Sequence, residues 1–230
     1  MSGALASLTA ADLGGLAIAE ALKRAGVSPE QVDHVIMGQV LMAGQGQVPS
    51  RQAAVNAGIP MNVPSVNVNK VCLSGLNSIY LADQMIQSGD ADIVVAGGME
   101  SMTKAPYLAQ GARGGFRYGN TELEDSIIRD GLWCAFDSCL MGLGTDRYTG
   151  DTISRAEQDE ASAMSHERAA TATKDGLLAD EVVPVSIPVG RGDAFLVERV
   201  GGVRPGRGAV GVGEGRGGGG AGGAVGAGGA

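Results

Sequence analysis

Cys72 is the residue of this sequence that is best suited to covalent chemistry. It stands in NKVCLSGLNS, residues 69–78, between a short apolar run and the expected start of a helix. On this context two interpretations stay open. A cysteine among apolar neighbours is most often a packed, unreactive side chain. A thiol at the junction of a strand and a helix instead lies near unpaired backbone N–H groups and the positive end of the helix dipole, which favour the reactive thiolate.

Few other residues of the chain have types suited to nucleophilic or metal chemistry. Cys134 and Cys139 form no CxxC pair and have no histidine at ligand spacing, so neither a zinc site nor a disulfide framework is predicted. Both are interpreted as ordinary thiols. His34 falls in an expected strand and His166 in an expected helix, and both are interpreted as structural or solvated. No metal is expected.

The segments around Cys72 alternate between helix and strand patterns. A helix is predicted over residues 10–25, where Thr9 can cap the start and Gly26 ends it. A second helix is predicted at 50–57 and a third from Ser74 onward. Strands are predicted at 32–40, 65–71 and 92–98. Nearly continuous apolar strands between helices favour an α/β fold, with a parallel or mixed sheet covered on both faces.

The predicted helix after Cys72 carries large apolar residues at helical spacing. Such a pattern is typical of one broad apolar face. The residues available to that face are Leu76, Ile79, Tyr80, Met85 and Ile86.

The pattern loosens in the second half of the chain. Residues 105–150 are rich in Gly, Tyr and Arg and are expected to form an inserted loop region. Ser154 and Glu157 fit a capping box, which predicts a helix running to about residue 174 and stopping at Gly176. Residues 181–189 resemble a strand, but its two prolines confine it to an edge or an irregular excursion.

Composition excludes several classes of partner. The chain has 230 residues, of which 44% are hydrophobic, enough for a sizeable core. Its net charge of −8 argues against nucleic acid, because neutralising phosphates needs clustered Lys and Arg. No apolar stretch approaches the roughly 20 residues that cross a bilayer, and MSGALASLTA lacks a basic leader. No membrane partner is expected, and the expected location is the cytoplasm.

The last part of the sequence differs from the rest. Residues 207–230 consist almost entirely of Gly, Ala, Val and Arg, with no aromatic residue and no period. Such a segment buries too little apolar surface to offset its chain entropy, so it is expected to be disordered. A flexible linker or tail and an out-of-frame translation of a GC-rich gene are both compatible with this composition.

Several longer stretches resemble one enzyme family. NKVCLSGLNSIYLAD (69–83) and DIVVAGGMESMTKAPY (92–107) closely resemble the thiolases, the acetyl-CoA C-acetyltransferases and 3-ketoacyl-CoA thiolases. GQVLMAGQGQVPSRQAAVNAGIP and DGLWCAFDSCLMG extend the resemblance, which covers about residues 3–206. It implies a thiolase-like layered αβα domain, incomplete, with an inserted loop domain. The expected boundaries are 1–103 for the partial N-terminal domain, 104–206 for the loop domain and 207–230 for a nonfamily tail.

The resemblance implies a reaction and a nucleophile. Cys72 takes the position of the cysteine that accepts an acyl group from acyl-CoA, for Claisen condensation or thiolysis through an acyl-cysteine. Acyl-CoA and CoA are the implied partners, with no cofactor beyond these thioesters. The segment MESMT, residues 99–103, is expected close to the cysteine in a supporting role. Family members are homo-oligomers, dimers or tetramers, and ARGGFRYGNTELEDSIIRDG resembles their tetramerisation segment.

The resemblance also implies contacts with CoA in the loop domain. Leu132 and Met141 match apolar contacts of the pantetheine, with plain core packing as the alternative. Leu140 stands where biosynthetic members commonly have a histidine. Arg191 or Arg204 could meet the 3′-phosphate or stack on adenine, or be solvated.

The later catalytic motifs of the family do not occur in this sequence. These are a Gly-His-Pro histidine, an Asn-Glu-Ala-Phe segment and a second cysteine before a glycine run. The family's first strand with its Arg-Thr-Pro turn is also missing ahead of GALASLTA, so a truncated chain is expected. A second hypothesis therefore stands beside the enzyme: a catalytically incomplete thiolase fragment that only binds acyl-CoA or a partner subunit.

Overall fold

The computed structural model describes residues 2–189 and 193–198. These residues divide into two compact units, one up to Gly131 and one from Leu132 onward, and each is described by itself. The glycine-rich segment 207–230 lies outside the described residues, as do Arg191 and Arg204.

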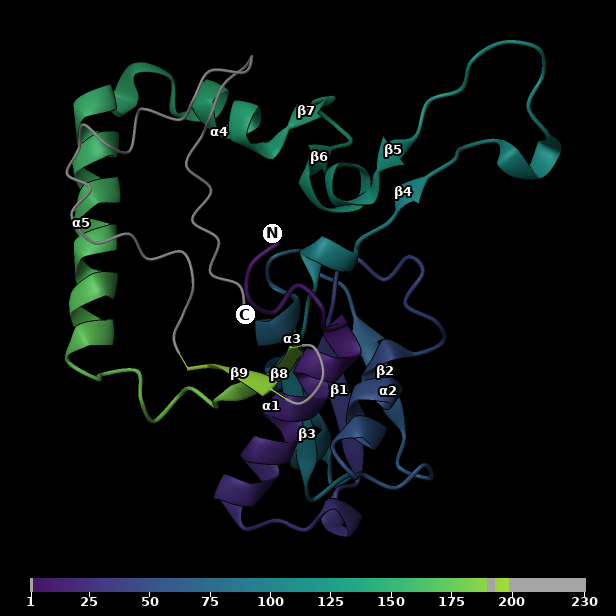
Figure 1. Ribbon diagram of the computed structural model, residues 1–230, viewed down its shortest axis with the longest axis vertical. Helices are drawn as coiled ribbons and strands as arrows, with labels where there is room; N and C mark the ends of the chain where they lie inside the picture. Colours follow the sequence, from purple (N-terminus) through teal and green to yellow (C-terminus); the bar gives the residue numbers. More distant parts are fainter. Residues whose placement is uncertain (1, 190–192, 199–230) are drawn as a thin grey trace. The chain divides into compact units, whose positions relative to one another are not determined.

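The first unit is built on a parallel sheet of three strands in the order β2-β1-β3 (Figure 1). Its main elements are α1 (Ala10–Ala25), β1 (His34–Gly38), α2 (Pro49–Asn56), β2 (Ser65–Val68), α3 (Ser74–Ser88) and β3 (Val94–Gly98). Each of these lies within two residues of a predicted segment, except that β1, β2 and β3 are shorter than the predicted strands. The α/β class and the parallel sheet are confirmed.

Helices cover both faces of the sheet. Val35 and Met37 of β1 belong to the buried core that α1 and α2 share. Ile36 and Gly38 point to the opposite face, because side chains alternate along a strand, and Gly38 meets the start of α3. The first unit is therefore a layered αβα arrangement, which explains why four of the five β1 residues are buried.

The boundaries of α1 follow from its local chemistry. The Thr9 hydroxyl accepts a hydrogen bond from the Asp12 amide at 3.1 Å, and the Asp12 carboxylate accepts one from the Thr9 amide at 2.9 Å. This capping box satisfies donors that a helix start leaves unpaired. At the other end Gly26 adopts the left-handed conformation, with φ of 66°. The predicted cap and stop are both confirmed.

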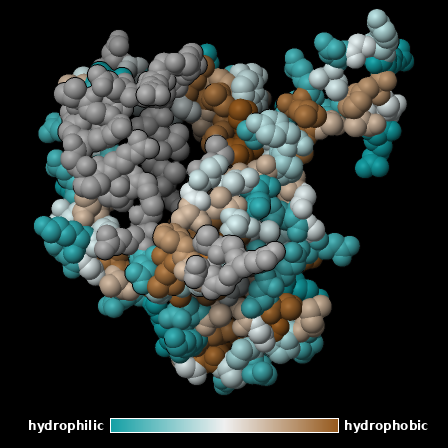
Figure 2. Space-filling model, viewed as in Figure 1, coloured by the Kyte–Doolittle hydropathy of each residue, from teal (hydrophilic) through white to brown (hydrophobic). Residues whose placement is uncertain are grey.

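The predicted apolar face of α3 is not the face that packs on the sheet. Leu76, Ile79 and Tyr80 are 64%, 54% and 59% exposed. The buried residues of α3 are instead small: Ser74, Ser78 and Ala82. The reason is that the helix approaches the sheet too closely for large side chains, at the glycines that end β1 and β3. Figure 2 shows that hydrophobic side chains reach the surface at several places on the face in view.

The rest of the first unit is a run of short elements. Three 3₁₀ turns lie at Pro29–Gln31, Met102–Lys104 and Ala112–Gly114. The two-residue strands β4 (Tyr107–Leu108) and β5 (Glu124–Asp125) pair antiparallel. A π-helix, Ile127–Leu132, runs to the first residue of the second unit.

The described residues of the second unit form two hairpins and two α-helices. Strands β6 (Trp133–Cys134) and β7 (Cys139–Leu140) form the first hairpin, and β8 (Val185–Val189) and β9 (Asp193–Val197) form the second. Helix α4 spans Met141–Thr149, a 3₁₀ turn spans Gly150–Thr152, and α5 spans Arg155–Lys174. The expected loop region 105–150 is therefore partly ordered into hairpins and a helix, because its short strands pair locally.

Two predictions for this second half are confirmed. The Ser154 hydroxyl accepts from the Glu157 amide at 3.3 Å, and the Glu157 carboxylate accepts from the Ser154 amide at 2.7 Å, which makes the capping box of α5. The proline-containing strand β8 pairs with β9 in a sheet of two strands, so it is an edge. Among the described residues no helix is long and apolar enough to cross a bilayer.

Candidate functional site

Cys72 lies in the turn that connects β2 to α3, and its side chain is exposed. The carboxyl ends of parallel strands lie side by side along one edge of their sheet, the edge that runs across the strand ends. The turn follows the carboxyl end of β2 and so lies at this edge. Ligands of open α/β sheets bind at this edge. The packed, buried interpretation of this thiol is therefore excluded, and the thiol is accessible at the edge where α/β proteins place their chemistry.

The turn before the helix is held by its own hydrogen bonds. The Lys70 amide donates to the Ser74 hydroxyl at 2.8 Å, and that hydroxyl donates to the Val71 carbonyl at 2.6 Å. The Asn69 side chain accepts from the Val71 amide at 3.0 Å. These contacts fix the backbone on both sides of Cys72.

Val71, directly before the cysteine, has a φ of 50°. A β-branched residue in this region is an outlier, because its Cβ crowds the backbone, at a cost of about 1 to 3 kcal/mol. Such strain persists only where surrounding contacts enforce it, and it gathers at functional sites. The sequence gives no sign of this conformation.

The start of α3 is set against the sheet by three glycines. A Cβ added to Gly38 would lie 2.4 Å from the Ser74 carbonyl carbon and 2.5 Å from the Gly75 nitrogen. A Cβ on Gly98 would lie 3.3 Å from the Gly75 Cα. Only glycine at the end of β1 allows this approach. The Ser78 hydroxyl also donates to the Gly97 carbonyl at 2.8 Å, which ties α3 to β3.

The first turn of α3 offers backbone donors beside the cysteine. The N-cap residue Leu73 has no side-chain acceptor. The amides of Ser74 and Asn77 donate to the Val71 and Leu73 carbonyls. The amides of Gly75 and Leu76, as expected for the first turn of a helix, have no acceptor among the residues the structure describes. They can stabilise negative charge on a thiolate or on an oxygen that approaches it.

Two polar contacts support the same edge from within the fold. The Asn67 side chain of β2 accepts from the Ser50 amide at 2.9 Å and donates to the buried Gln39 side chain at 3.2 Å. Glu100 accepts from the Val40 amide at 2.8 Å. Burial raises the pKa of Glu100, and the backbone N–H donors of Val40 and Leu41 oppose that rise. The only signal of these roles in the sequence is that polar residues stand in or directly after the apolar strands, and none of the roles was predicted.

The histidine of the first unit, His34, lies away from the cysteine turn. His34 begins β1, so it lies at the amino end of the strands, whereas the cysteine turn lies at their carboxyl end. Burial lowers the pKa of His34. His166 lies on α5, in the second unit. Within 2–189 and 193–198, no three His, Cys, Asp or Glu side chains gather as metal ligands.

The predicted CoA contacts and the other two cysteines belong to the second unit, whereas Cys72 belongs to the first. Leu132 is half-buried at the end of the π-helix, and Met141, 51% exposed, begins α4. Cys134 and Cys139 lie directly opposite each other in the β6–β7 hairpin. This pairing was not predicted from the sequence. Met99, from the predicted supporting segment, is buried in the core of the first unit.

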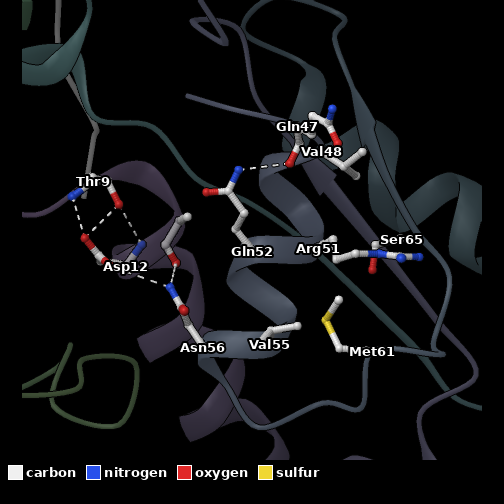
Figure 3. A pocket seen from close by; sticks show the side chains of 11 residues that line it. Thr9, Asp12, Gln47, Val48, Arg51, Gln52, Val55, Asn56, Met61 and Ser65 are labelled. Atoms are coloured by element: carbon white, nitrogen blue, oxygen red, sulfur yellow. Dashed lines mark hydrogen bonds between the residues drawn. The ribbon is translucent and has the colours of Figure 1, made fainter. Parts of the chain in front are cut away.

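A cavity of about 700 Å³ opens elsewhere in the first unit, beside α1, α2 and β2 (Figure 3). Thr9 and Asp12 lie on one side of the view and Arg51 and Ser65 on the other. Most polar groups there serve local hydrogen bonds, such as the Asn56 amide to the Ala11 carbonyl at 3.4 Å. The cavity includes no residue of the cysteine turn, so it is separate from the site at Cys72.

The sequence is similar to one family and to named bacterial enzymes. Residues 1–210 match the family described as "Thiolase, N-terminal domain". A "Probable acetyl-CoA acetyltransferase" of Mycobacterium leprae is 51% identical over 205 residues, which are 89% of this chain and 52% of that protein. The corresponding protein of Mycolicibacterium smegmatis is 50% identical over 205 residues, 89% of this chain and 53% of its own length.

A third relative is the "Acetyl-CoA acetyltransferase" of Cupriavidus necator, 49% identical over 192 residues, 83% of this chain and 49% of that protein. The chain thus spans about half the length of the curated relatives it matches. Since the family match covers most of the chain, and the αβα layers agree with it, this chain belongs to the thiolase family and carries its N-terminal domain.

Proposed function

We propose that Cys72 accepts an acyl group from an acyl-CoA, as the covalent step of thiolase-type acyl transfer. The observation that carries this proposal is the exposed thiol in a strained, hydrogen-bonded turn at the start of α3. The names of the relatives, which state acetyl-CoA acetyltransferases, support acetyl-CoA as the donor.

The step follows from thioester chemistry. The Cys72 thiolate attacks the carbonyl carbon of the thioester, and the carbonyl electron pair moves to oxygen. Collapse of this intermediate breaks the bond to the CoA sulfur, which leaves as the thiolate and takes a proton from solvent. A thiolate both attacks and leaves a thioester readily, so an acyl-cysteine suits transfer in either direction.

The residues of the first unit can assist this step at two points. The free amides of Gly75 and Leu76 supply N–H donors to the negative charge that develops on the thioester oxygen. Stabilising this charge is usually the largest single contribution to catalysis of acyl transfer. Lys70 places a cation beside the first turn, where its ammonium group donates to the Asn77 side chain at 3.3 Å. These groups orient and stabilise, and they supply no general base.

Carbon–carbon bond formation needs such a base to remove an α-proton from acetyl-CoA. The histidine of the first unit, His34, begins β1 at the opposite end of the strands from the cysteine turn, and the family's later histidine motif does not occur in the sequence. The proposal for this chain is therefore acylation and its reversal. Losing a positioned base typically costs about 10² to 10⁴ in rate, so condensation by this chain alone should be far slower than acylation.

The experiment is acylation of the purified chain with acetyl-CoA. Mass spectrometry of the tryptic peptide that begins at Val71 should show one acetyl group, with release of an equal amount of CoA. Cys72→Ala should remove both signals, and Cys134→Ala, which changes a half-buried thiol in the other unit, should keep them. CoA binding without acetylation of Cys72 would instead support the fragment that only binds acyl-CoA or a partner subunit.

The remaining expectations accompany this proposal. CoA thioesters are the substrates, with no further cofactor, and Leu132 and Met141 contact the pantetheine. We expect the chain to be a homo-oligomer, a dimer or a tetramer, in the cytoplasm. The supporting observation is the similarity to bacterial acetyl-CoA acetyltransferases over most of the chain. Sedimentation of the purified chain tests the oligomer directly.

A further inference from the structure

Two cysteines of the second unit face each other across a hairpin. Cys134 of β6 and Cys139 of β7 are direct partners in the antiparallel register. Directly opposite residues share one face of a hairpin, with Cα atoms about 4.5 or 5.5 Å apart. A disulfide requires Cα atoms about 4.4 to 6.8 Å apart. The register therefore places the two Cα atoms within the range that a disulfide requires. The bond can form without a large movement of the backbone.

The two thiols differ in their accessibility. Cys134 is half-buried, whereas Cys139 is 4% exposed. The Cys134 thiol donates to the Asp137 carboxylate at 3.4 Å and accepts from the Asp137 amide at 3.4 Å. The Cys139 sulfur packs against α4, where a Cβ on Gly144 would lie 3.8 Å from it. A partly exposed thiol with a second thiol directly opposite it resembles the redox-sensing cysteines that have a resolving cysteine next to them.

A cavity opens beside residues that neighbour the two sulfurs. It has a volume of about 320 Å³ and is lined by Asp137, Gly144, Arg147 and Tyr148. Asp137 is hydrogen-bonded to the Cys134 sulfur, and Gly144 lies next to the Cys139 sulfur. The cavity is therefore lined by two residues that lie next to the sulfurs, and it leaves room beside the pair for a molecule as small as a peroxide.

We propose that Cys134 and Cys139 form a redox-active pair that a peroxide converts into a disulfide across the β6–β7 hairpin. The Cys134 sulfur attacks one peroxide oxygen, the O–O bond breaks, and Cys134 becomes a sulfenic acid while one water leaves. The Cys139 thiol then attacks the Cys134 sulfur, forms the S–S bond and releases a second water. One peroxide is reduced to two waters and two thiols are oxidised. Disulfides in reducing compartments are typically of this transient kind.

The pair lies between the two predicted contacts with CoA. Leu132 directly precedes β6, and Met141 directly follows β7. A bond between the strands fixes the twist of the hairpin and the separation of its ends. This consequence rests on the proposed function: oxidation should weaken CoA binding, and reduction should restore it.

The site is tested on the full chain carrying Cys72→Ala, which leaves only this pair of thiols. The protein is treated with hydrogen peroxide, and its remaining thiols are alkylated. Chymotrypsin then cleaves after Phe136, between the two cysteines. We expect two peptides joined by a disulfide, which separate on reduction. The fluorescence of Trp133, the single tryptophan, should change with the same time course, because it is the residue next to Cys134.

Matched variants separate the two roles. In Cys139→Ser the sulfenic acid should accumulate at Cys134, where dimedone captures it. In Cys134→Ser the buried Cys139 should stay unoxidised. Unchanged thiols, sulfinic acid at Cys134 without a disulfide, or a disulfide between two chains would each overturn the proposal. The parent chain alone decides between these outcomes if a variant does not fold.

Titration with CoA tests the consequence. The oxidised chain should bind CoA about fivefold or more weakly than the reduced chain, within the usual range of coupling between sites. Equal affinity in both states would refute the effect on binding. If neither state binds CoA while the disulfide forms, the proposed function fails and the redox pair stands.

Discussion

Gly38→Ala tests whether the contact between β1 and α3 sets the position of Cys72. The new Cβ would lie 2.4 Å from the Ser74 carbonyl carbon, whereas ordinary van der Waals contact begins at 3.4 Å. The backbone at the start of α3 must therefore retreat by about 1 Å, because the obstructing atoms are backbone and cannot rotate away. Overpacking of this kind costs about 1 to 3 kcal/mol of unfolding free energy.

The same retreat should slow the chemistry at Cys72. Ser74 is two residues from the cysteine, and its hydroxyl bonds both Lys70 and Val71. A displacement of about 1 Å can cost about 10²-fold in rate. Gly38→Ala should thus lower both the unfolding free energy, measured by circular dichroism in urea, and the rate of acetylation by acetyl-CoA.

Two neighbouring glycines supply matched controls with the same substitution. A Cβ on Gly98 would lie 3.3 Å from the Gly75 Cα, a slightly crowded contact. A Cβ on Gly75 would lie 3.8 Å from the Gly98 Cα, which is ordinary van der Waals contact. Gly98→Ala should cost less than Gly38→Ala. Gly75→Ala should be neutral or stabilise by about 0.5 to 1 kcal/mol, since alanine is the better helix former. Equal losses in Gly38→Ala and Gly75→Ala would refute the close-contact argument.

Three further predictions concern single side chains. Because burial raises the pKa of Glu100 above 4.5, the folded chain holds this proton more tightly than the unfolded chain. The unfolding free energy, measured in urea, should fall as pH rises from 4.5 through the folded pKa. Glu100→Gln should flatten this part of the plot of unfolding free energy against pH, and an unchanged slope in the variant would contradict the role given to Glu100. Val71→Gly should leave stability unchanged or raise it by up to about 1 kcal/mol, because glycine adopts positive φ freely, whereas Val66→Gly in β2 should destabilise in the same assay. Leu76→Gln with Ile79→Gln should reduce binding of a hydrophobic dye, with an unfolding free energy within about 0.5 kcal/mol of the parent, as expected for exposed positions; a larger loss would mean that these residues are packed.

Features decided by neighbouring residues could be predicted from the sequence. The Thr9 cap of α1 and the Ser154–Glu157 capping box of α5 depend on side chains within three residues of each other, and both are confirmed, while the Asp12 half of the α1 box was not predicted. The alternation of strand and helix around Cys72 likewise follows from short apolar runs and the breaks between them. The motifs around Cys72 also identified the family, because they are specific to it and extend over most of the chain.

Features decided by distant residues could not be predicted in this way. The amphipathic pattern of α3 suggested that its large apolar residues pack inward, since the apolar face of a helix usually covers the core. The glycine contacts at Gly38 and Gly98 reverse that outcome. The pairing of Cys134 with Cys139 could not be predicted either, because the spacing of two cysteines in a sequence does not determine the register of the hairpin that carries them.

The strand that leads to Cys72 shows how a polar contact can replace an apolar one. The sequence SVNVNKV alternates valine with asparagine, a pattern typical of a strand with one buried face. In β2, however, no residue is fully buried: three are partly buried and one is exposed. Helix α2 has Val48 at its N-cap, a residue with no side-chain acceptor. The Asn67 carbonyl supplies that acceptor to the Ser50 amide from the neighbouring strand.

This contact makes the start of α2 and the approach to Cys72 depend on each other. A helix start without a capping oxygen loses about 0.5 to 2 kcal/mol, and here the compensating oxygen belongs to β2. Val68, the residue after Asn67, pairs with Gly38 in the ladder, and Gly38 is the residue that contacts α3. The exposed thiol is therefore positioned by a continuous set of backbone and amide contacts from α2 through β2 and β1 to α3.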